Sequence, residues 1–169
     1  MIYNANIELE KKRRVFNSEP FTIEQIKKLC DHHNITPLTD HTVDGAVAYR
    51  HRRKNIILDN PILTAIQLVL NLGHEFGHFP LGHVKDHGSP LHMSDPFADQ
   101  GKEKDAGIIG FLMWLPTKEI CKMIRDGRID IEEVLNFSRY IDPDLTEDEA
   151  LEICNARIRI FNALRRVSR

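Results

Sequence analysis

The chain has 169 residues, of which 41% are hydrophobic and 28% are charged, and its formal net charge is −2 at pH 7. This length and balance are typical of one compact domain with a hydrophobic core, and they exclude a disordered chain. The slight negative charge provides no overall attraction to nucleic acid, so the composition argues against direct nucleic-acid binding.

The N-terminus and the cysteines indicate the compartment. Residues 1–14 are polar and charged and lack an apolar core, so we expect no signal peptide there. No apolar run approaches the roughly 20 residues that a membrane helix needs, so we expect no membrane partner. The three cysteines are odd in number and widely spaced, which is typical of reduced thiols. We therefore expect a cytoplasmic protein.

The first part of the chain predicts a helix followed by strands. Thr22 opens a capping box, and the helix that it begins ends at Asn34. Alternation over residues 42–49 and the apolar run 56–59 predict an antiparallel hairpin. The basic turn between these strands, residues 50–55, is either solvated charge or a contact for an acidic partner.

Helical apolar spacing begins at Ile62 and predicts a long buried helix over about residues 62–80. Gly73 and Gly77 lie inside it, and each costs about 1 kcal/mol in a helix interior relative to alanine. We therefore expect another element to pack closely against the glycine face of this helix.

The segment His74-Glu75-Phe76-Gly77-His78 near the end of that helix reads H-E-x-x-H. Positions i and i+4 lie on one helix face, so His74 and His78 can bind one metal ion together. Glu75 points elsewhere and is the natural general base toward water. Two imidazole ligands beside a carboxylate base are the arrangement of zinc hydrolases. We predict Zn²⁺ as the cofactor and Glu75 as the catalytic residue.

A loop and a second apolar helix follow the motif. Residues 84–101 are rich in His, Gly, Pro, Ser and Asp and predict a long surface loop. Residues 102–115 predict a helix that Pro116 ends. We expect residues 1–116 to form an α+β core, mostly helical with a small antiparallel sheet or hairpin beside the motif helix.

The C-terminal third predicts a group of short helices. One begins with Thr117 as its cap and ends after Arg125, since Gly127 follows. Another occupies about residues 130–137, and an amphipathic helix follows the capping pattern that starts at Thr146. We expect residues 117–169 to be a helical subdomain packed on the core.

A catalytic zinc site keeps one position open for water, so a third protein ligand must come from outside the motif. The acidic candidates are Glu103 and Asp105, at the start of the next helix. Glu103 is favoured because it shares a face with Ala106 and Gly110, whose small size allows close approach to the metal helix. Asp105 is offset but within reach, and His83 is a further alternative.

Several other polar residues are candidates without firm spacing. His83, His87 and His92 lie in or beside the predicted loop, where they are either solvated or metal-binding. Tyr49 and His51, in the predicted hairpin, are candidates for stabilising the oxyanion of a transition state.

Two stretches resemble the ImmA/IrrE family of metallopeptidases. The family pattern H-E-x-G-H, often followed by an apolar run ending in L-G-H, is matched by residues 74–83. Its second pattern, E-x-E-A-[N/D]-x-F-A before a Leu-rich stretch and Pro, is similar to residues 103–116. Asp105 replaces the second acid of that pattern, Gly107 replaces the Asn or Asp, and Ile109-Gly110 replaces the F-A pair. A family ligand at the Asp105 position has a shorter arm here, whereas one at the Glu103 position is intact.

The resemblance covers roughly residues 22–164 and implies a zincin-like fold and a zinc-dependent endopeptidase. Its usual substrate is a helix-turn-helix transcriptional repressor, typically encoded beside it in phages and mobile elements, and cleavage relieves repression. The alternative is a non-catalytic zinc-binding regulator that binds a repressor or antitoxin-like partner through its basic hairpin and C-terminal helices. Glu75 argues against this alternative, because a structural zinc site does not need a base.

Overall fold

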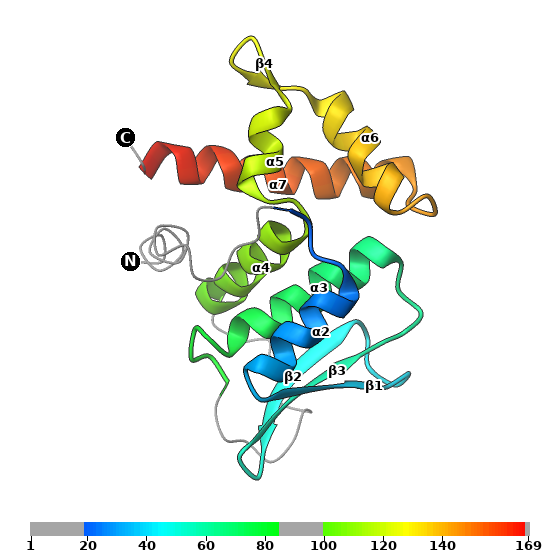
Figure 1. Ribbon diagram of the computed structural model, residues 1–169, viewed down its shortest axis with the longest axis vertical. Helices are drawn as coiled ribbons and strands as arrows, with labels where there is room; N and C mark the ends of the chain where they lie inside the picture. The colour runs from blue at the N-terminus through cyan, green and yellow to red at the C-terminus, as the bar shows by residue number, and fades with distance from the viewer. Residues whose placement is uncertain (1–18, 85–99, 168–169) are drawn as a thin grey trace.

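The fold, seen in a computed structural model that describes residues 19–84 and 100–167, is a mixed α+β arrangement (Figure 1). The described elements, in chain order, are α2 (Ile23–His32), β1 (Ile35–Thr39), β2 (Ala46–His51), β3 (Lys54–Asp59), α3 (Ala65–His78), α4 (Gln100–Trp114), α5 (Thr117–Lys122), β4 (Ile124–Arg125), β5 (Arg128–Ile129), α6 (Ile131–Ile141) and α7 (Glu147–Val167). The mixed class agrees with the sequence prediction. Most of the predicted loop, residues 85–99, lies outside the described part of the chain.

The larger sheet has the strand order β1-β3-β2. Its antiparallel β2–β3 hairpin was predicted, but β2 starts and ends later than residues 42–49, and β3 starts two residues before the predicted run 56–59. His51 pairs with Lys54, so the turn consists of Arg52 and Arg53 rather than residues 50–55. Strand β1 lies parallel to β3 on its other side, a pairing that the sequence pattern did not indicate. Helices α2 and α3 pack against this sheet (Figure 1).

Helix α3, which carries the H-E-x-x-H segment, begins three residues later than predicted. Ile62 is 76% exposed and precedes the helix. Thr64 is the N-cap: its side chain accepts a hydrogen bond from the Gln67 amide, and the Gln67 side chain accepts one from the Thr64 amide. The helix ends at His78, with Phe79 as C-cap. The apolar spacing therefore extends a few residues N-terminal to the first helical residue, Ala65.

A carboxylate from the C-terminal part of the chain also holds the first turn of α3. The Ile66 amide donates to Asp142 Oδ2 over 2.9 Å. Asp142 is 2% exposed and is itself the C-cap of α6. Amides in the first turn of a helix have no partner within the helix, so this side chain satisfies one of them across the packed interior.

The C-terminal part differs from its prediction at α5. Pro116, not Thr117, is the N-cap, and it makes no side-chain cap bond. The helix ends at Lys122 instead of Arg125, because β4 and β5 form a short hairpin around Asp126 and Gly127. Both turn residues have positive φ, so the glycine that suggested a helix end belongs to a reverse turn.

Helix α7 is a single helix of 21 residues that follows the predicted capping pattern at Thr146, and it is longer than the short helices expected for this part of the chain. Arg157 is fully buried and ties α7 to the junction after α4. Its Nε donates to the Leu115 carbonyl over 2.7 Å, and its Nη2 donates to Thr117 Oγ1 over 3.3 Å. Thr117 therefore serves as an acceptor for α7 rather than as a helix cap.

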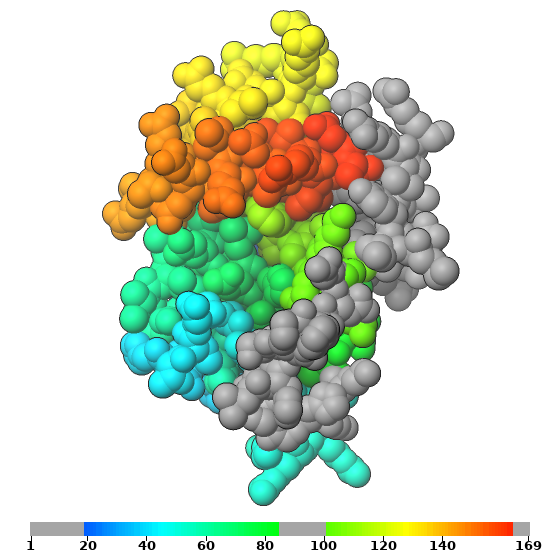
Figure 2. Space-filling model, turned by 180° about the vertical axis from the view of Figure 1, so that it is seen from behind, coloured from blue at the N-terminus to red at the C-terminus, as the bar shows by residue number. Residues whose placement is uncertain are grey.

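One hydrophobic cluster runs through both predicted units. It includes Ile26 and Ile57 near the sheet, Phe76 on α3, and Val134 and Cys154 in the C-terminal helices. The C-terminal helices lie across one end of the molecule, and the β2–β3 turn projects at the other (Figure 2). The division at residue 116 stays a prediction, and the two parts share this core. No described helix has the length and apolarity needed to cross a bilayer.

We predict that Asp142→Ala lowers the free energy of unfolding by about 1–3 kcal/mol, because the buried Ile66 amide loses its acceptor. Urea denaturation of the full chain measures the change. Asp144→Ala is the matched control, since Asp144 is exposed two residues away. Equal stability of the two variants would contradict the role assigned to the Asp142 carboxylate.

Candidate metal centre

The last turns of α3 bring the two motif histidines together. The Nε2 atoms of His74 and His78 lie 3.0 Å apart, and their rings meet edge to face. The prediction that His74 and His78 lie together on one helix face is therefore confirmed. His78 is 4% exposed, whereas the His74 side chain is 26% exposed, so the pair lies at the border between core and solvent.

Helix α4 adds a carboxylate to this pair. Glu103 Oε2 lies 3.0 Å from His74 Nε2 and 3.5 Å from His78 Nε2. Its side chain is 48% exposed, so the group is open to solvent on the Glu103 side. Among the residues that the structure describes, these three could hold a metal ion.

The spacing of the three ligand atoms suits a small tetrahedral cation. Ligand atoms about 2.1 Å from a tetrahedral zinc ion lie about 3.4 Å from one another. The separations here are 3.0, 3.0 and 3.5 Å. Three protein ligands leave one coordination position for water or substrate, as catalytic zinc sites require.

Close packing of α4 on α3 determines where Glu103 lies. A Cβ added to Gly73 would lie 2.8 Å from Gly110 Cα, and one added to Gly77 would lie 3.2 Å from Ala106 Cα. The expected close contact on the glycine face is thus confirmed, and α4 makes it. Helices this close allow a side chain in the first turn of α4 to reach His74 and His78.

Asp105 does not join the group among the described residues. Asp105 is 8% exposed on α4, whereas Glu103 on the same helix places Oε2 3.0 Å from His74 Nε2. The geometry therefore agrees with the preference for Glu103, whose role as a metal ligand stays a prediction.

Glu75 is held beside the group by the sheet. Its Oε2 accepts a hydrogen bond of 2.6 Å from the Ala48 amide of β2, and its Oε1 lies 3.9 Å from His74 Nε2. Burial raises the pKa of Glu75 to about 8; the Ala48 hydrogen bond opposes this rise and the Glu103 charge adds to it. A cation bound nearby would favour the ionised form.

The surroundings of His78 favour its neutral form. Burial lowers the pKa of His78 to about 4, with Glu103 opposing this shift and the neighbouring histidines adding to it. The ring is therefore neutral at pH 7, the form in which imidazole binds a metal. Its second nitrogen, Nδ1, lies 3.1 Å from Nδ1 of His83.

His83 lies behind His78 rather than with the ligand group. The His83 amide donates to the His78 carbonyl over 2.8 Å, which folds the chain back after α3. The imidazole contact is on the Nδ1 side of His78, while Nε2 faces His74 and Glu103. A hydrogen bond there would orient the ring, as partners of metal-binding histidines do.

The remaining candidates are not brought to the group by any described contact. Tyr49 and His51 lie on β2, on the opposite face from the buried side chain of Ala48, because side chains alternate along a strand. His87 and His92 lie outside the described residues.

Sequence reasoning missed the Ala48 amide, which is the direct partner of Glu75. A backbone amide has no residue signature, so only the position of the strand relative to the motif helix could have indicated it.

No protein-family model matches the chain, and no curated protein matches it.

We predict that the purified protein binds one Zn²⁺ per chain and that Glu103→Gln weakens this binding by more than the roughly 10-fold that loss of a partner behind a metal ligand can cost, because it removes the charge of a direct ligand. Competition with a chromophoric chelator measures the affinity. Asp105→Asn is the matched control, because its position is two residues away on the same helix. Loss of zinc in Asp105→Asn with full retention in Glu103→Gln would reverse the assignment.

We predict that Gly110→Ala destabilises the fold by about 1–3 kcal/mol and weakens zinc binding, because overpacking must move α4 and Glu103. An added Cβ would lie 2.5 Å from the Leu70 carbonyl oxygen and 3.0 Å from the His74 amide nitrogen. In Gly107→Ala, the control, the Cβ meets His74 Nδ1 at an ordinary 3.5 Å. Thermal unfolding and zinc titration compare them, and equal behaviour would contradict the close contact.

Proposed function

We propose that this protein is a zinc-dependent endopeptidase with a zincin-like core, related to the ImmA/IrrE metallopeptidases. The substrate that we propose is a helix-turn-helix transcriptional repressor, whose cleavage would relieve repression. The repressor part of the proposal rests on the resemblance of the H-E-x-G-H and E-x-E-A stretches to that family. The peptidase part rests on the arrangement of the candidate metal centre.

The observation that supports catalysis most directly is the position of Glu75. A closed structural zinc site has four protein ligands and does not need an additional carboxylate. Here three candidate ligands converge, and a second acidic side chain, Glu75, lies beside them with one oxygen fixed by Ala48. Fixing Oε2 leaves Oε1 directed toward the ligand group, 3.9 Å from His74 Nε2.

The residues have distinct parts in the proposed hydrolysis. A bound zinc ion supplies Lewis acidity toward the scissile carbonyl and lowers the pKa of water to about 7. Glu75 Oε1 takes a proton from the attacking water as the C–O bond forms. Glu75 then gives that proton to the leaving amine as the C–N bond breaks. The Ala48 hydrogen bond keeps the carboxylate oriented through both transfers.

Strand β2 offers a place for the substrate backbone. It pairs with β3 on one side, and no other described strand pairs with it on the opposite side. An extended peptide can add to such an edge through main-chain hydrogen bonds. Because the Ala48 amide reaches Glu75, a peptide along this edge would pass the candidate metal centre.

We predict that Glu75→Gln lowers the rate of peptide hydrolysis by roughly 10²- to 10⁴-fold, since removing a general base has effects of this size. Zinc content should be unchanged, because Glu75 is not a proposed ligand. Cleavage of a purified helix-turn-helix repressor, followed by mass spectrometry, measures the rate. The control is Glu24→Gln, an exposed position on α2.

Two results would decide against this proposal. Full cleavage by Glu75→Gln would remove Glu75 from the mechanism. Tight binding of the repressor without cleavage by the zinc-loaded protein would favour the non-catalytic regulator.

A further inference from the structure

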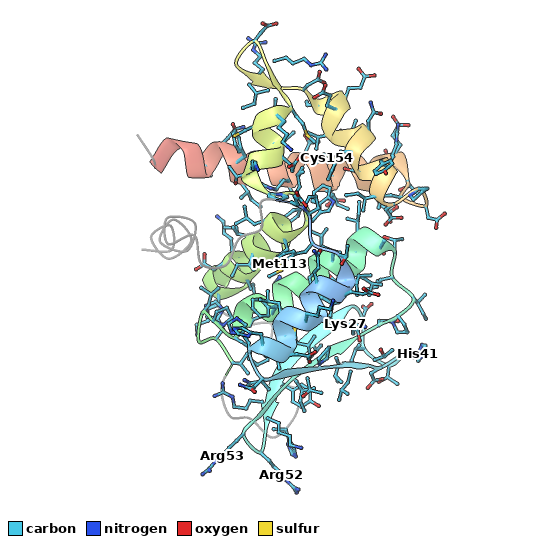
Figure 3. The ribbon with its side chains drawn as sticks, viewed as in Figure 1. Lys27, His41, Arg52, Arg53, Met113 and Cys154 are labelled. Atoms are coloured by element: carbon cyan, nitrogen blue, oxygen red, sulfur yellow. The ribbon has the colours of Figure 1, made fainter. Side chains whose placement is uncertain are left out.

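The turn of the β2–β3 hairpin and the first residue of β3 present three exposed cations, Arg52, Arg53 and Lys54, together called the hairpin tip. Arg52 and Arg53 point away from the body of the protein (Figure 3). Within residues 19–84 and 100–167, no carboxylate forms an ion pair with any of the three. The positive charge of the hairpin tip is therefore not neutralised by the described part of the protein.

Arg52 and Arg53 both adopt a left-handed backbone conformation that arginine disfavours. Arg52 has φ of 48° and Arg53 has φ of 68°. A two-residue turn with positive φ at both positions is favoured by Asn-Gly and similar pairs. A side chain with a Cβ costs roughly 1–2 kcal/mol in this left-handed region. Turn geometry thus does not explain these arginines, and strain of this kind motivates a functional explanation.

The hairpin tip is continuous with the strand edge beside the candidate metal centre. The Ala48 amide points away from β3 to Glu75, so the free edge of β2 faces that centre at Ala48. Arg52 follows four positions later, which corresponds to about 13 Å along an extended strand. A peptide laid along β2 would bring its residues three to five positions from the scissile bond near the hairpin tip.

We propose that the hairpin tip recognises acidic side chains of the substrate, so that the enzyme selects peptides with Asp or Glu three to five residues from the scissile bond. This inference rests on the proposed peptidase function and adds a determinant of its specificity. Charge complementarity identifies the partner: an acidic peptide segment would supply the carboxylates that the arginines lack. An acidic peptide fits better than nucleic acid, because the chain is net negative and the hairpin tip is a small group of three cations at the end of one hairpin.

The decisive variant is Arg52→Asn combined with Arg53→Gly. It removes both charges and introduces residues that suit the turn, so the hairpin should be at least as stable as in the wild type. The matched control, Lys118→Gln with Arg159→Gln, removes the same charge from exposed positions on α5 and α7. These helices lie at the opposite end of the molecule from the turn (Figure 1).

The probes are fluorogenic peptides with a neutral core. One has three Glu residues on the N-terminal side of the core, another has them on the C-terminal side, and a third has Gln at all those positions. Cleavage is measured on zinc-loaded full-length protein. Binding of the same peptides is measured by fluorescence anisotropy in a Glu75→Gln background.

For the wild type we expect kcat/KM for one of the Glu peptides to exceed that for the Gln peptide roughly tenfold, and the difference to shrink at high salt. The anisotropy measurement should show the same preference. In Arg52→Asn/Arg53→Gly the preference disappears while the Gln peptide is cleaved as before, and the Lys118/Arg159 control keeps it.

The remaining outcomes are decisive. Equal cleavage of Glu and Gln peptides by the wild type overturns the inference and leaves the peptidase intact. A preference that survives in Arg52→Asn/Arg53→Gly also overturns it. Charge-dependent binding without any cleavage supports acidic recognition and overturns the peptidase. Binding of a short DNA duplex through the hairpin tip, without preference for Glu peptides, overturns it in favour of nucleic acid.

Discussion

The close contact between α3 and α4 is the constraint on which the candidate metal centre depends. Both histidines belong to α3, and the carboxylate belongs to α4, so the three meet only where the helix axes approach closely. Glycine faces glycine at the closest point, because any Cβ on Gly110 would meet the α3 backbone at 2.5 Å. Each glycine lowers local helix stability by about 1 kcal/mol. The close helix contact that they allow places Glu103 Oε2 3.0–3.5 Å from the Nε2 atoms of the two histidines.

The sheet contributes to the same centre through backbone rather than side chains. Glu75 is 7% exposed, and a buried carboxylate is costly unless it is hydrogen-bonded. The Ala48 amide provides that bond from the outward edge of β2. The catalytic candidate is therefore positioned by helix and strand together, while the continuation of the same strand ends in the hairpin tip. Strand β2 would then both orient the proposed catalytic residue and lead directly to the proposed substrate-recognition residues.

Local patterns predicted much of this protein, and tertiary partners account for the rest. The capping patterns at Thr22 and Thr146, the antiparallel hairpin and the H-E-x-x-H pair were readable because each depends on residues near in sequence. The start of α3 was misplaced because apolar spacing at Ile62 precedes the true cap at Thr64. The role of Thr117 and the parallel pairing of β1 depend on residues or strands far along the chain. The choice between Glu103 and Asp105 could not be made from the sequence, because it depends on how closely α4 packs against α3.

The hydrogen bond from Ile66 to Asp142 has a consequence for synthesis of the chain. Its partners are 76 positions apart, so it closes one of the long loops of the fold. Contacts of high sequence separation form late, since loop closure must precede them. During translation, α3 can emerge with both motif histidines well before Asp142 is available to its first turn. A nascent chain at that stage has the metal-binding residues but lacks the contact that anchors the opposite end of their helix.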